Sequence, residues 1–372
     1  MIIFKLKLYT KYILSFFLSI IIILLHKKNR LNIKTTNNFI FFLYGGIGDH
    51  LLLVNLINEL SKKHNVSVFL DNRFKDIEIF LPKSKILNYT KNNLVKLFKD
   101  IRELNKKSIF VSHSSSLELQ LLYLISNCKF FFGFNGSYDN FFFNTIYKNK
   151  IKNKYKIYHE LFFDYLKLKN DFNILNIIQP DRNVIKYFNI SKKKYLIINI
   201  NKTHYWGDVS MPIIEWSNYI NNSKKLLDYS LILVGNGELE NKKNDQLYRL
   251  INSQIYDVIN LTNKTSLFDL SSLIYFSSFI ITNDTGVMHL SNLFKKKNIS
   301  LFTFSDPMIF ANYENSLVIH NPKYDCQPCV NKSLRGNENY PPICKNNFSC
   351  NKTISSIDLE KITDHYLSNL DS

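Results

Sequence analysis

The chain has 372 residues, of which 45% are hydrophobic and 15% aromatic, and it carries a formal net charge of +18. This length favours two domains over one, and the apolar content excludes a disordered chain. The charge indicates an anionic partner, although Lys, Asn, Ile, Phe and Tyr are abundant together, as an AT-rich genome would produce. Because the chain lacks an arginine-rich block and an aromatic RNA-binding signature, we expect no nucleic-acid partner.

An apolar segment at residues 12–25 (YILSFFLSIIIILL) lies between basic residues near the N-terminus. It is shorter than the ~20 apolar residues that span a bilayer, and no small-residue cleavage site follows it. Basic flanks on both sides suit a helix at an anionic membrane surface. We therefore expect residues 1–34 to attach a cytoplasmic protein to the membrane, and a single-pass anchor is the alternative.

Short apolar runs alternate with helical patterns from residue 39 onward. The helical pattern at 49–63 places Leu52, Leu56 and Leu60 on one face. Continuous apolar runs of this length are typical of buried parallel strands. The β–α–β order predicts a parallel, doubly wound sheet. The predicted strands are residues 39–44, 66–70, 108–113 and 128–134.

A second series of the same kind follows a polar segment at 176–194, which contains Pro180. This segment is expected to connect two domains, which we place at residues 35–185 and 186–372. The chain therefore predicts two α/β domains in tandem. In the second domain the predicted strands are 195–200, 229–235, 279–284 and 298–304, and the predicted helices are 212–227, 266–278, 286–296 and 355–370.

The first predicted strand ends in a glycine-rich turn. The chain has only 10 glycines, and Gly45, Gly46 and Gly48 stand between this strand and the first helix. Glycine allows positive φ and a close approach of another molecule, and a helix N-terminus attracts anions. Asp49, in the first helical turn, either caps the helix or takes a proton from a bound hydroxyl. Because GIGDHL lacks the third glycine of the dinucleotide fingerprint, a dehydrogenase with Asp71 on the ribose is only an alternative.

The stretch FIITNDTGVMHLSNLF, residues 279–294, is a second strand–turn–helix unit. Asp284 and Thr285 suit a helix N-cap, Gly286 opens the backbone, and His289 lies in the first turn. This pattern has two interpretations. It is either a capped helix with a surface histidine or a site for the phosphates of a nucleotide.

Together with LILVGNGELE and LFTFSDP, these two units occur in an order that resembles glycosyltransferase family 9, the bacterial lipopolysaccharide heptosyltransferases. The resemblance runs from about residue 39 to the C-terminal helix. It implies the GT-B fold, in which two doubly wound, Rossmann-like domains face each other across a cleft. It also implies inverting transfer of heptose from ADP-heptose, with no cofactor required for catalysis.

The resemblance implies roles for particular residues. Asp49 matches the general base, and Thr285, Gly286 and His289 resemble the diphosphate site. Asp284 is similar to the acid that engages the sugar or shapes the turn. Glu238 resembles the residue on the nucleoside ribose, with a first-turn helix acid as the alternative. Lys202, chosen over His204, would neutralise the leaving phosphate.

Four cysteines gather near the C-terminus, at Cys326, Cys329, Cys344 and Cys350. One CxxC pair followed by a loosely spaced second pair suggests structural zinc. A cytosolic location argues against disulfides. Cys128, in an apolar segment, is expected to be a small buried side chain.

We thus expect a heptosyltransferase at the cytoplasmic face of the inner membrane, acting on a lipid-anchored lipopolysaccharide core. Two alternatives remain open. One is an enzyme of the same fold that uses another nucleotide sugar, and the other is an inactive, membrane-attached relative that only binds sugar nucleotides.

Overall fold

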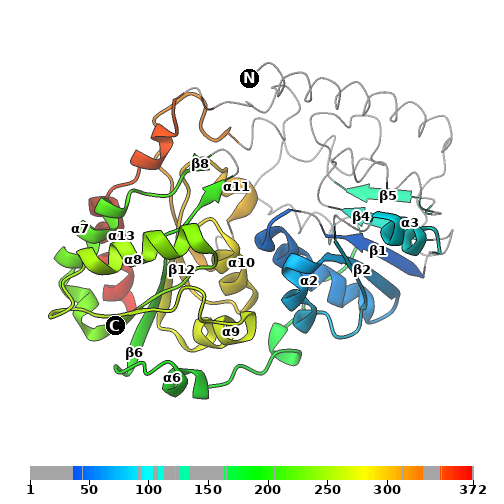
Figure 1. Ribbon diagram of the computed structural model, residues 1–372, viewed down its shortest axis with the longest axis horizontal. Coiled ribbons are helices and arrows are strands. Elements are labelled where there is room, and N and C mark those ends of the chain that lie inside the picture. Colours follow the sequence, from blue (N-terminus) through cyan, green and yellow to red (C-terminus); the bar gives the residue numbers. More distant parts are fainter. Residues whose placement is uncertain are drawn as a thin grey trace. The chain divides into compact units, whose positions relative to one another are not determined.

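The computed structural model describes residues 37–43, 45–90, 94–103, 108–112, 130–133, 166–204, 207–311, 314–329 and 346–370, with residues 122, 126, 128, 163 and 344. These residues form two compact units that divide between Phe172 and Asn173 (Figure 1). The predicted membrane segment, residues 1–34, lies outside the described residues. Within the described ranges, no helix combines the length and the apolar character that crossing a bilayer requires.

The first unit is built on a five-stranded parallel sheet with the order β3-β2-β1-β4-β5. β1 is buried along almost its whole length, which explains its unbroken apolar sequence. The chain leaves β1 toward one edge of the sheet through β2 and β3 and then returns to β4 on the other side. The elements are β1 (Asn38–Phe42), α2 (Ile47–Ser61), β2 (Asn65–Asp71), η2 (Asn72–Phe80), β3 (Lys85–Tyr89), α3 (Leu94–Arg102), β4 (Ile109–Ser112) and β5 (Phe130–Gly133).

The second unit holds a six-stranded parallel sheet with the order β10-β9-β6-β11-β12-β13. Its strands are β6 (Lys194–Asn199), β9 (Tyr229–Leu233), β10 (Asp257–Asn260), β11 (Phe279–Asn283), β12 (Asn298–Leu301) and β13 (Ser316–Ile319). A small antiparallel pair, β7 (Thr203–His204) and β8 (Gly207–Asp208), follows β6. The order reverses between β6 and β11, so this sheet is doubly wound.

Helices cover both faces of the second sheet (Figure 1). Because the chain moves in opposite directions from β6 and from β10, right-handed crossovers place α7 and α8 on one face and α9 and α10 on the other. α13 packs beside α7. The helices are η3 (Ile174–Asn176), α6 (Asn183–Tyr187), α7 (Ile213–Asn222), η4 (Lys224–Asp228), α8 (Glu238–Leu250), α9 (Leu267–Phe276), α10 (Gly286–Leu293), α11 (Pro307–Phe310), η5 (Ser349–Lys352) and α13 (Ser356–Leu370).

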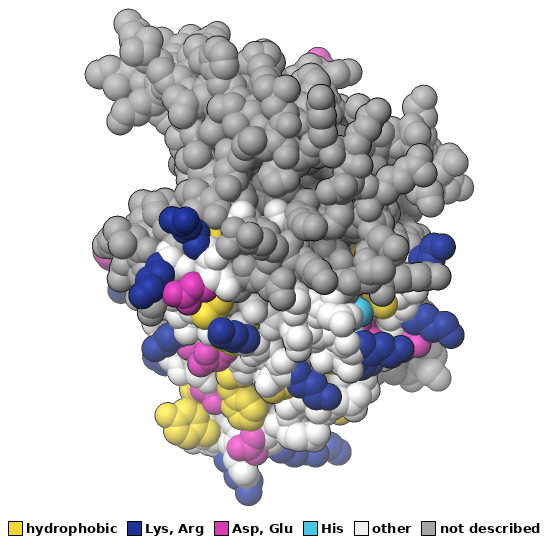
Figure 2. Space-filling view, turned by 90° about the vertical axis from the view of Figure 1, so that its right-hand side faces the viewer, with side chains coloured by type: hydrophobic (Ala, Val, Ile, Leu, Met, Phe, Trp, Pro, Cys, Tyr) yellow, Lys and Arg dark blue, Asp and Glu magenta, His cyan; other side chains and the backbone are white. Residues whose placement is uncertain are grey.

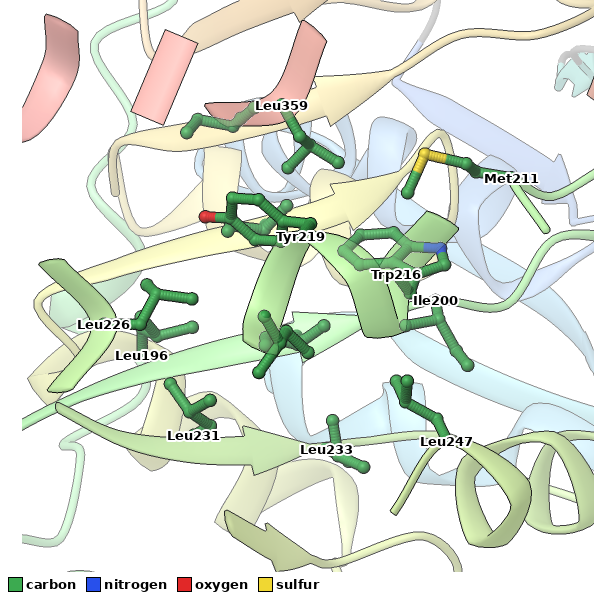
Figure 3. Close-up of a cluster of buried hydrophobic side chains, with 14 of the residues drawn as sticks. Leu196, Ile200, Met211, Trp216, Tyr219, Leu226, Leu231, Leu233, Leu247 and Leu359 are labelled. Atoms are coloured by element: carbon green, nitrogen blue, oxygen red, sulfur yellow. The ribbon is translucent and has the colours of Figure 1, made fainter. Parts of the chain in front are cut away.

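The main core of the second unit lies between its sheet and the α7 layer (Figure 3). Trp216 and Tyr219 of α7 are fully buried there, against Leu196 and Leu231 of the strands. The Tyr219 hydroxyl donates to Thr363 Oγ1 at 2.9 Å, so its polar end is satisfied by α13. This core fixes the strand ends from which the turns described below project.

The predicted strands and helices are confirmed, and the prediction missed the short pair β7 and β8 and three strands of the two parallel sheets. β3, β10 and β13 are short edge strands with few fully buried side chains. They therefore lack the continuous apolar run that identified the central strands. The helix predicted at 212–227 is also shorter than expected, since α7 ends at Asn222 and η4 follows it.

Lysine and arginine side chains are spread over the described part of the face in Figure 2, with acidic and apolar side chains among them. Charge on this face is therefore mixed.

Candidate functional site

The turns that follow β6, β9 and β11 carry most of the predicted site residues of the second unit. β6 lies between β9 and β11, so the carboxyl ends of these three parallel strands are neighbours. The reversal of strand order falls between β6 and β11. This is the position in doubly wound sheets where ligands bind.

Lys202 and Asp284 meet at this position. Lys202 Nζ lies 2.5 Å from Asp284 Oδ2 and also donates to the Asp284 carbonyl oxygen. Both side chains are largely buried, with 15% and 8% of their surface exposed. The ammonium also lies 5.1 Å from the centre of the Phe304 ring. Two of its three hydrogens point to Asp284, which leaves one for a ligand.

Several donors surround the Asp284 carboxylate. Ser305 Oγ donates to Oδ2, and His289 Nε2 lies 3.7 Å from Oδ1. Burial by itself would raise the pKa of Asp284, but Lys202 and His289, with hydrogen bonds from Lys202 and Ser305, outweigh it and lower the pKa. Asp284 is therefore ionised at neutral pH and holds a cation at the end of β11.

The turn after β11 leads directly into α10. Thr285 is its N-cap residue with an extended backbone, and its side chain caps no helical N–H. The Thr285 hydroxyl instead donates to Asn199 Oδ1 at 3.3 Å. The first turn of the helix, which begins at Gly286 and contains His289, therefore presents its N–H groups at the strand ends beside Lys202. This is a favourable place for an anion.

Glu238 and Glu240 differ sharply in the first turn of α8. Glu238 has 82% of its side chain exposed and pairs with Lys242 at 2.8 Å, as a helix surface acid does. Glu240 instead folds back and accepts the Asn236 N–H at 2.9 Å. Burial raises the pKa of Glu240, partly offset by the Asn236 N–H and by Lys243.

A buried amide network links the same strand ends. Asn201 Nδ2 donates to Asn244 Oδ1 at 3.1 Å, and Asn244 Nδ2 donates to Thr262 Oγ1 at 2.6 Å. Within the described part of the chain, Asn201 Oδ1 and Asn283 Oδ1 are buried without a hydrogen-bond partner. Such oxygens can accept hydrogen bonds from a ligand. Sequence reasoning missed Glu240, Asn201 and Asn283, because no motif singles them out.

The predicted residues of the first unit lie in the turn from β1 to α2. Gly45 has φ +106°, a conformation that favours glycine, and it alone of the three glycines has a positive φ. Gly46 is the N-cap of α2, and its N–H donates to Asp49 Oδ2 at 2.9 Å. Asp49 thus caps the helix. The turn also exposes Gly45 and Gly46 and leaves Asp49 partly exposed.

A buried histidine supports this turn. His50 Nδ1 lies 2.7 Å from the Gly46 carbonyl oxygen, so Nδ1 carries the hydrogen and donates. The ring packs against Phe74 with centroids 4.8 Å apart. Together, these contacts fix the backbone from which Asp49 projects.

The dehydrogenase alternative assigned Asp71 to a ribose. In the structure Asp71 is buried and accepts hydrogen bonds from the backbone N–H, Nε and Nη2 of Arg73. Its carboxylate is thus engaged by a neighbour in the chain. This geometry gives the side chain a structural role at the end of β2.

The four C-terminal cysteines come near one another beside Phe304 and Val209, and all are free thiols. Burial, with the neighbouring cysteines, raises the pKa of Cys329 to about 12 and that of Cys350 to about 11. Among the described residues no group of three or more ligating side chains is placed to hold a metal ion. The zinc site therefore stays a prediction, which metal analysis of the purified protein tests. Cys128 is buried, as expected.

The cysteine segment touches the loop after β12. The Cys329 N–H donates to the Phe304 carbonyl oxygen at 2.8 Å, and the Gln327 side chain donates to the Thr303 carbonyl oxygen. Phe304 lies beneath Lys202, and the next residue, Ser305, bonds Asp284. Through these contacts, the segment that contains Gln327 and Cys329 helps to hold the loop that packs against the Lys202–Asp284 pair.

The chain is similar in sequence to known proteins. The sequence profile of glycosyltransferase family 9 (heptosyltransferase) matches residues 140–338. Lipooligosaccharide heptosyltransferase 2 from Campylobacter jejuni subsp. jejuni serotype O:2 is 27% identical over 265 residues, which are 68% of this chain and 76% of that protein.

Two solved structures share the fold. The Escherichia coli ADP-heptose lipopolysaccharide heptosyltransferase II is 15% identical, with a TM-score of 0.64 over 90% of this chain and 100% of that one. The E. coli heptosyltransferase WaaC with ADP is 14% identical, with a TM-score of 0.55 over 89% and 98%. The predicted α/β architecture with two parallel, doubly wound sheets is thus confirmed.

Proposed function

The chain belongs to glycosyltransferase family 9, and we propose that it transfers a heptose from ADP-heptose to a lipooligosaccharide or lipopolysaccharide core acceptor. The observation that carries this proposal is the buried Lys202–Asp284 pair beside the start of α10, at the reversal point of the second sheet. A cation and a helix N-terminus at one point suit the diphosphate of a nucleotide sugar.

On the donor side, Lys202 and the first turn of α10 would hold the diphosphate. Asp284 fixes the Lys202 ammonium by two hydrogen bonds, and Thr285, Gly286 and His289 form the turn beside it. As the bond from the anomeric carbon to the diphosphate breaks, negative charge grows on the leaving oxygen. A fixed ammonium stabilises this added charge, so it binds the transition state more tightly than the bound donor, whose diphosphate carries less negative charge.

For the nucleoside, Glu240 is a better candidate than Glu238. Glu240 lies against the Gly235–Gly237 turn, at the carboxyl end of β9, whereas Glu238 points to solvent. Asn201, whose buried side-chain oxygen has no hydrogen-bond partner among the described residues, lies at the adjacent end of β6. A carboxylate and an amide oxygen are acceptors that suit ribose hydroxyls.

On the acceptor side, Asp49 would act as the general base. Its carboxylate is oriented by the Gly46 N–H, and an ionised carboxylate can accept further hydrogen bonds from a sugar hydroxyl. In the proposed step, Asp49 takes the hydroxyl proton while the oxygen attacks the anomeric carbon from the face opposite the diphosphate. The new C–O bond forms, the donor bond breaks, ADP leaves, and the configuration inverts.

The proposed acceptor is anchored in lipid, so the enzyme would work at the cytoplasmic face of the inner membrane. The basic, apolar N-terminal segment supports this location.

The test is release of ADP from ADP-heptose in the presence of a heptose-deficient core acceptor, measured with wild type and Asp49→Asn. We expect wild-type turnover and a loss of at least about 100-fold in the variant. A panel of nucleotide sugars in the same assay distinguishes the donor, since faster turnover with another sugar would replace ADP-heptose. Tight donor binding without turnover on any acceptor would instead identify an inactive relative.

A further inference from the structure

One edge of the second sheet carries a row of lysines that the transferase site does not use. All six strands are parallel, so their first residues lie along one edge, which we call the amino-terminal edge. Three strands there are preceded or opened by lysine pairs and triplets. These are Lys192, Lys193 and Lys194 at β6, Lys224 and Lys225 before β9, and Lys295, Lys296 and Lys297 before β12.

Contacts between the loops confirm that these segments share the edge. The Lys192 N–H donates to Ser230 Oγ of β9 at 3.2 Å, and Ser191 Oγ donates to Asp257 Oδ2 of β10. Lys297 Nζ donates to the Glu314 carbonyl oxygen, just before β13. Because β11 pairs with both β6 and β12, the two groups of contacts lie on one continuous edge from β10 to β13.

Most of these lysines point to solvent. Lys193, Lys194, Lys224, Lys295 and Lys297 are exposed. Of these, Lys193, Lys224 and Lys295 have neither an ion pair nor a hydrogen bond from the side chain within the part of the chain that the structure describes. Lysines with no internal partner are available to an external anion.

The acidic groups at this edge do not balance the lysines. Asp257 accepts the hydroxyls of Ser191 and Ser230, and Asp364 lies 3.8 Å from Lys225. Asp228 and Glu314 at this edge are exposed, and so is 47% of the Asp364 side chain, against five exposed lysines. The exposed cations thus outnumber the exposed acids, and the edge is positive.

Apolar side chains protrude among the lysines. Leu227, two residues before β9, is 38% exposed. Ile255, two residues before the neighbouring strand β10, is 55% exposed. On α6, which leads to β6, Tyr187 is 75% exposed. Cations with protruding aliphatic and aromatic groups are the composition of surfaces that rest on lipid headgroups.

We propose that the amino-terminal edge of the second sheet docks on a bilayer rich in anionic phospholipid. Charge complementarity supplies the attraction, and Leu227 and Ile255 enter the headgroup layer. The candidate site lies at the opposite, carboxyl edge of the same sheet, so docking leaves its turns uncovered. A nucleic acid could also bind the lysines through its phosphates, but two exposed aliphatic side chains would add little to its affinity.

The first test measures partition of the full chain onto phosphatidylglycerol–phosphatidylcholine vesicles. The variant is Lys193→Gln/Lys224→Gln/Lys295→Gln. The matched control is Lys264→Gln/Lys323→Gln/Lys352→Gln, which removes the same charge from exposed lysines beyond the carboxyl ends of the strands. Because each lysine near an anionic surface strengthens binding about fivefold, we expect the edge variant to bind roughly 100-fold more weakly and the control to change little.

The second test reads contact directly and does not depend on the N-terminal segment. The tryptophan of Ile255→Trp adds fluorescence to that of the parent protein. After the parent signal is subtracted, brominated phosphatidylglycerol should quench this added fluorescence. The control is Ile357→Trp, a residue 60% exposed at the start of α13, which should not be quenched.

Equal partition of the two triple variants, or no quenching at residue 255, would overturn the proposal. So would loss of single-stranded RNA binding in the edge variant without loss of vesicle binding, since the partner would then be a nucleic acid. Neither test measures transferase activity, so failure of the docking surface leaves the proposed reaction untouched.

Discussion

Lys202→Met tests how much the buried Lys202–Asp284 ion pair contributes to the stability of the protein. Methionine keeps an unbranched side chain of similar length but removes the ammonium. Asp284 then remains buried, with Ser305 donating to it and His289 Nε2 3.7 Å away. The variant therefore isolates the contribution of one charge.

The expected magnitude follows from the burial of both partners. With only 15% and 8% of the two side chains exposed, removing one partner should lower the free energy of unfolding by about 3–5 kcal/mol. The Lys243–Asp208 pair is the matched control, because 47% of the Asp208 side chain is exposed. Lys243→Met should therefore cost only about 0.5 kcal/mol.

The pH dependence gives this prediction a distinctive sign. In the wild type the pKa of Asp284 is lowered, so its contribution is fully present above about pH 3.9 and is lost as pH falls through the lowered pKa. In Lys202→Met, burial dominates and raises that pKa above the unfolded value. The penalty is then present at neutral pH and is relieved by protonation as pH falls. The difference in the free energy of unfolding between wild type and variant should therefore decrease by up to about 1.4 kcal/mol for each pH unit below the raised pKa.

Urea unfolding at pH 7.5 and pH 5, followed by intrinsic fluorescence to which the buried Trp216 contributes, measures these differences. The double variant Lys202→Met/Asp284→Asn should recover most of the loss, because no buried charge remains unpaired. A loss below about 1 kcal/mol at pH 7.5, or the same loss at both pH values, would refute the interpretation.

The other predictions concern the turns that follow β1 and β9. Asp49→Asn should reduce turnover at least about 100-fold with little change in melting temperature, since the amide oxygen still accepts the Gly46 N–H; equal losses of activity and stability would make Asp49 only a cap. Glu240→Gln should weaken binding of the donor by about tenfold, as loss of one charged hydrogen bond does, whereas Glu238→Gln should leave the affinity unchanged. Titration calorimetry measures both affinities, and a larger loss in Glu238→Gln would make Glu238 the residue that contacts the nucleoside. Gly45→Ala should destabilise the first unit by about 1–2 kcal/mol, because alanine is strained at the φ of +106° that Gly45 adopts. Gly46→Ala, at φ −89°, should change the melting temperature little. Equal melting temperatures of the two variants would show that Gly45 is not needed for its backbone conformation.

Burial explains which parts of the fold could be predicted from the sequence. Central strands such as β6 and β9 are buried on both faces along almost their whole length, so apolar residues dominate their sequences. β10 is an edge strand whose four residues are all only partly buried, and its sequence DVIN gives no such run. Edge strands are placed by pairing with a neighbour, and a single sequence does not contain that information.

The site was predictable where a turn motif marks it and not where the fold brings distant residues together. Gly45 and Asp284 stand in recognisable strand–turn–helix units. Lys202 was chosen on the charge that the family's reaction needs, and its partner 82 residues away emerges only because β6 and β11 are neighbours. No sequence pattern marks Asn201 and Asn283. They are candidates only because their side-chain oxygens are buried and lack a hydrogen-bond partner in the described residues.

Glu240 shows what signal could have separated the two acids at the start of α8. Both are glutamates in the first turn, and propensity treats them alike. Gly237, with φ +100°, is the N-cap of α8, and Glu238, the first residue of the helix, points outward. At Gly235 a Cβ would lie 2.7 Å from Glu240 Oε2, so only glycine leaves room for the folded-back carboxylate. Gly235, five residues before Glu240, is therefore the feature of this sequence that goes with the inward turn of Glu240. Gly235→Ala should displace Glu240 and weaken donor binding much as Glu240→Gln does.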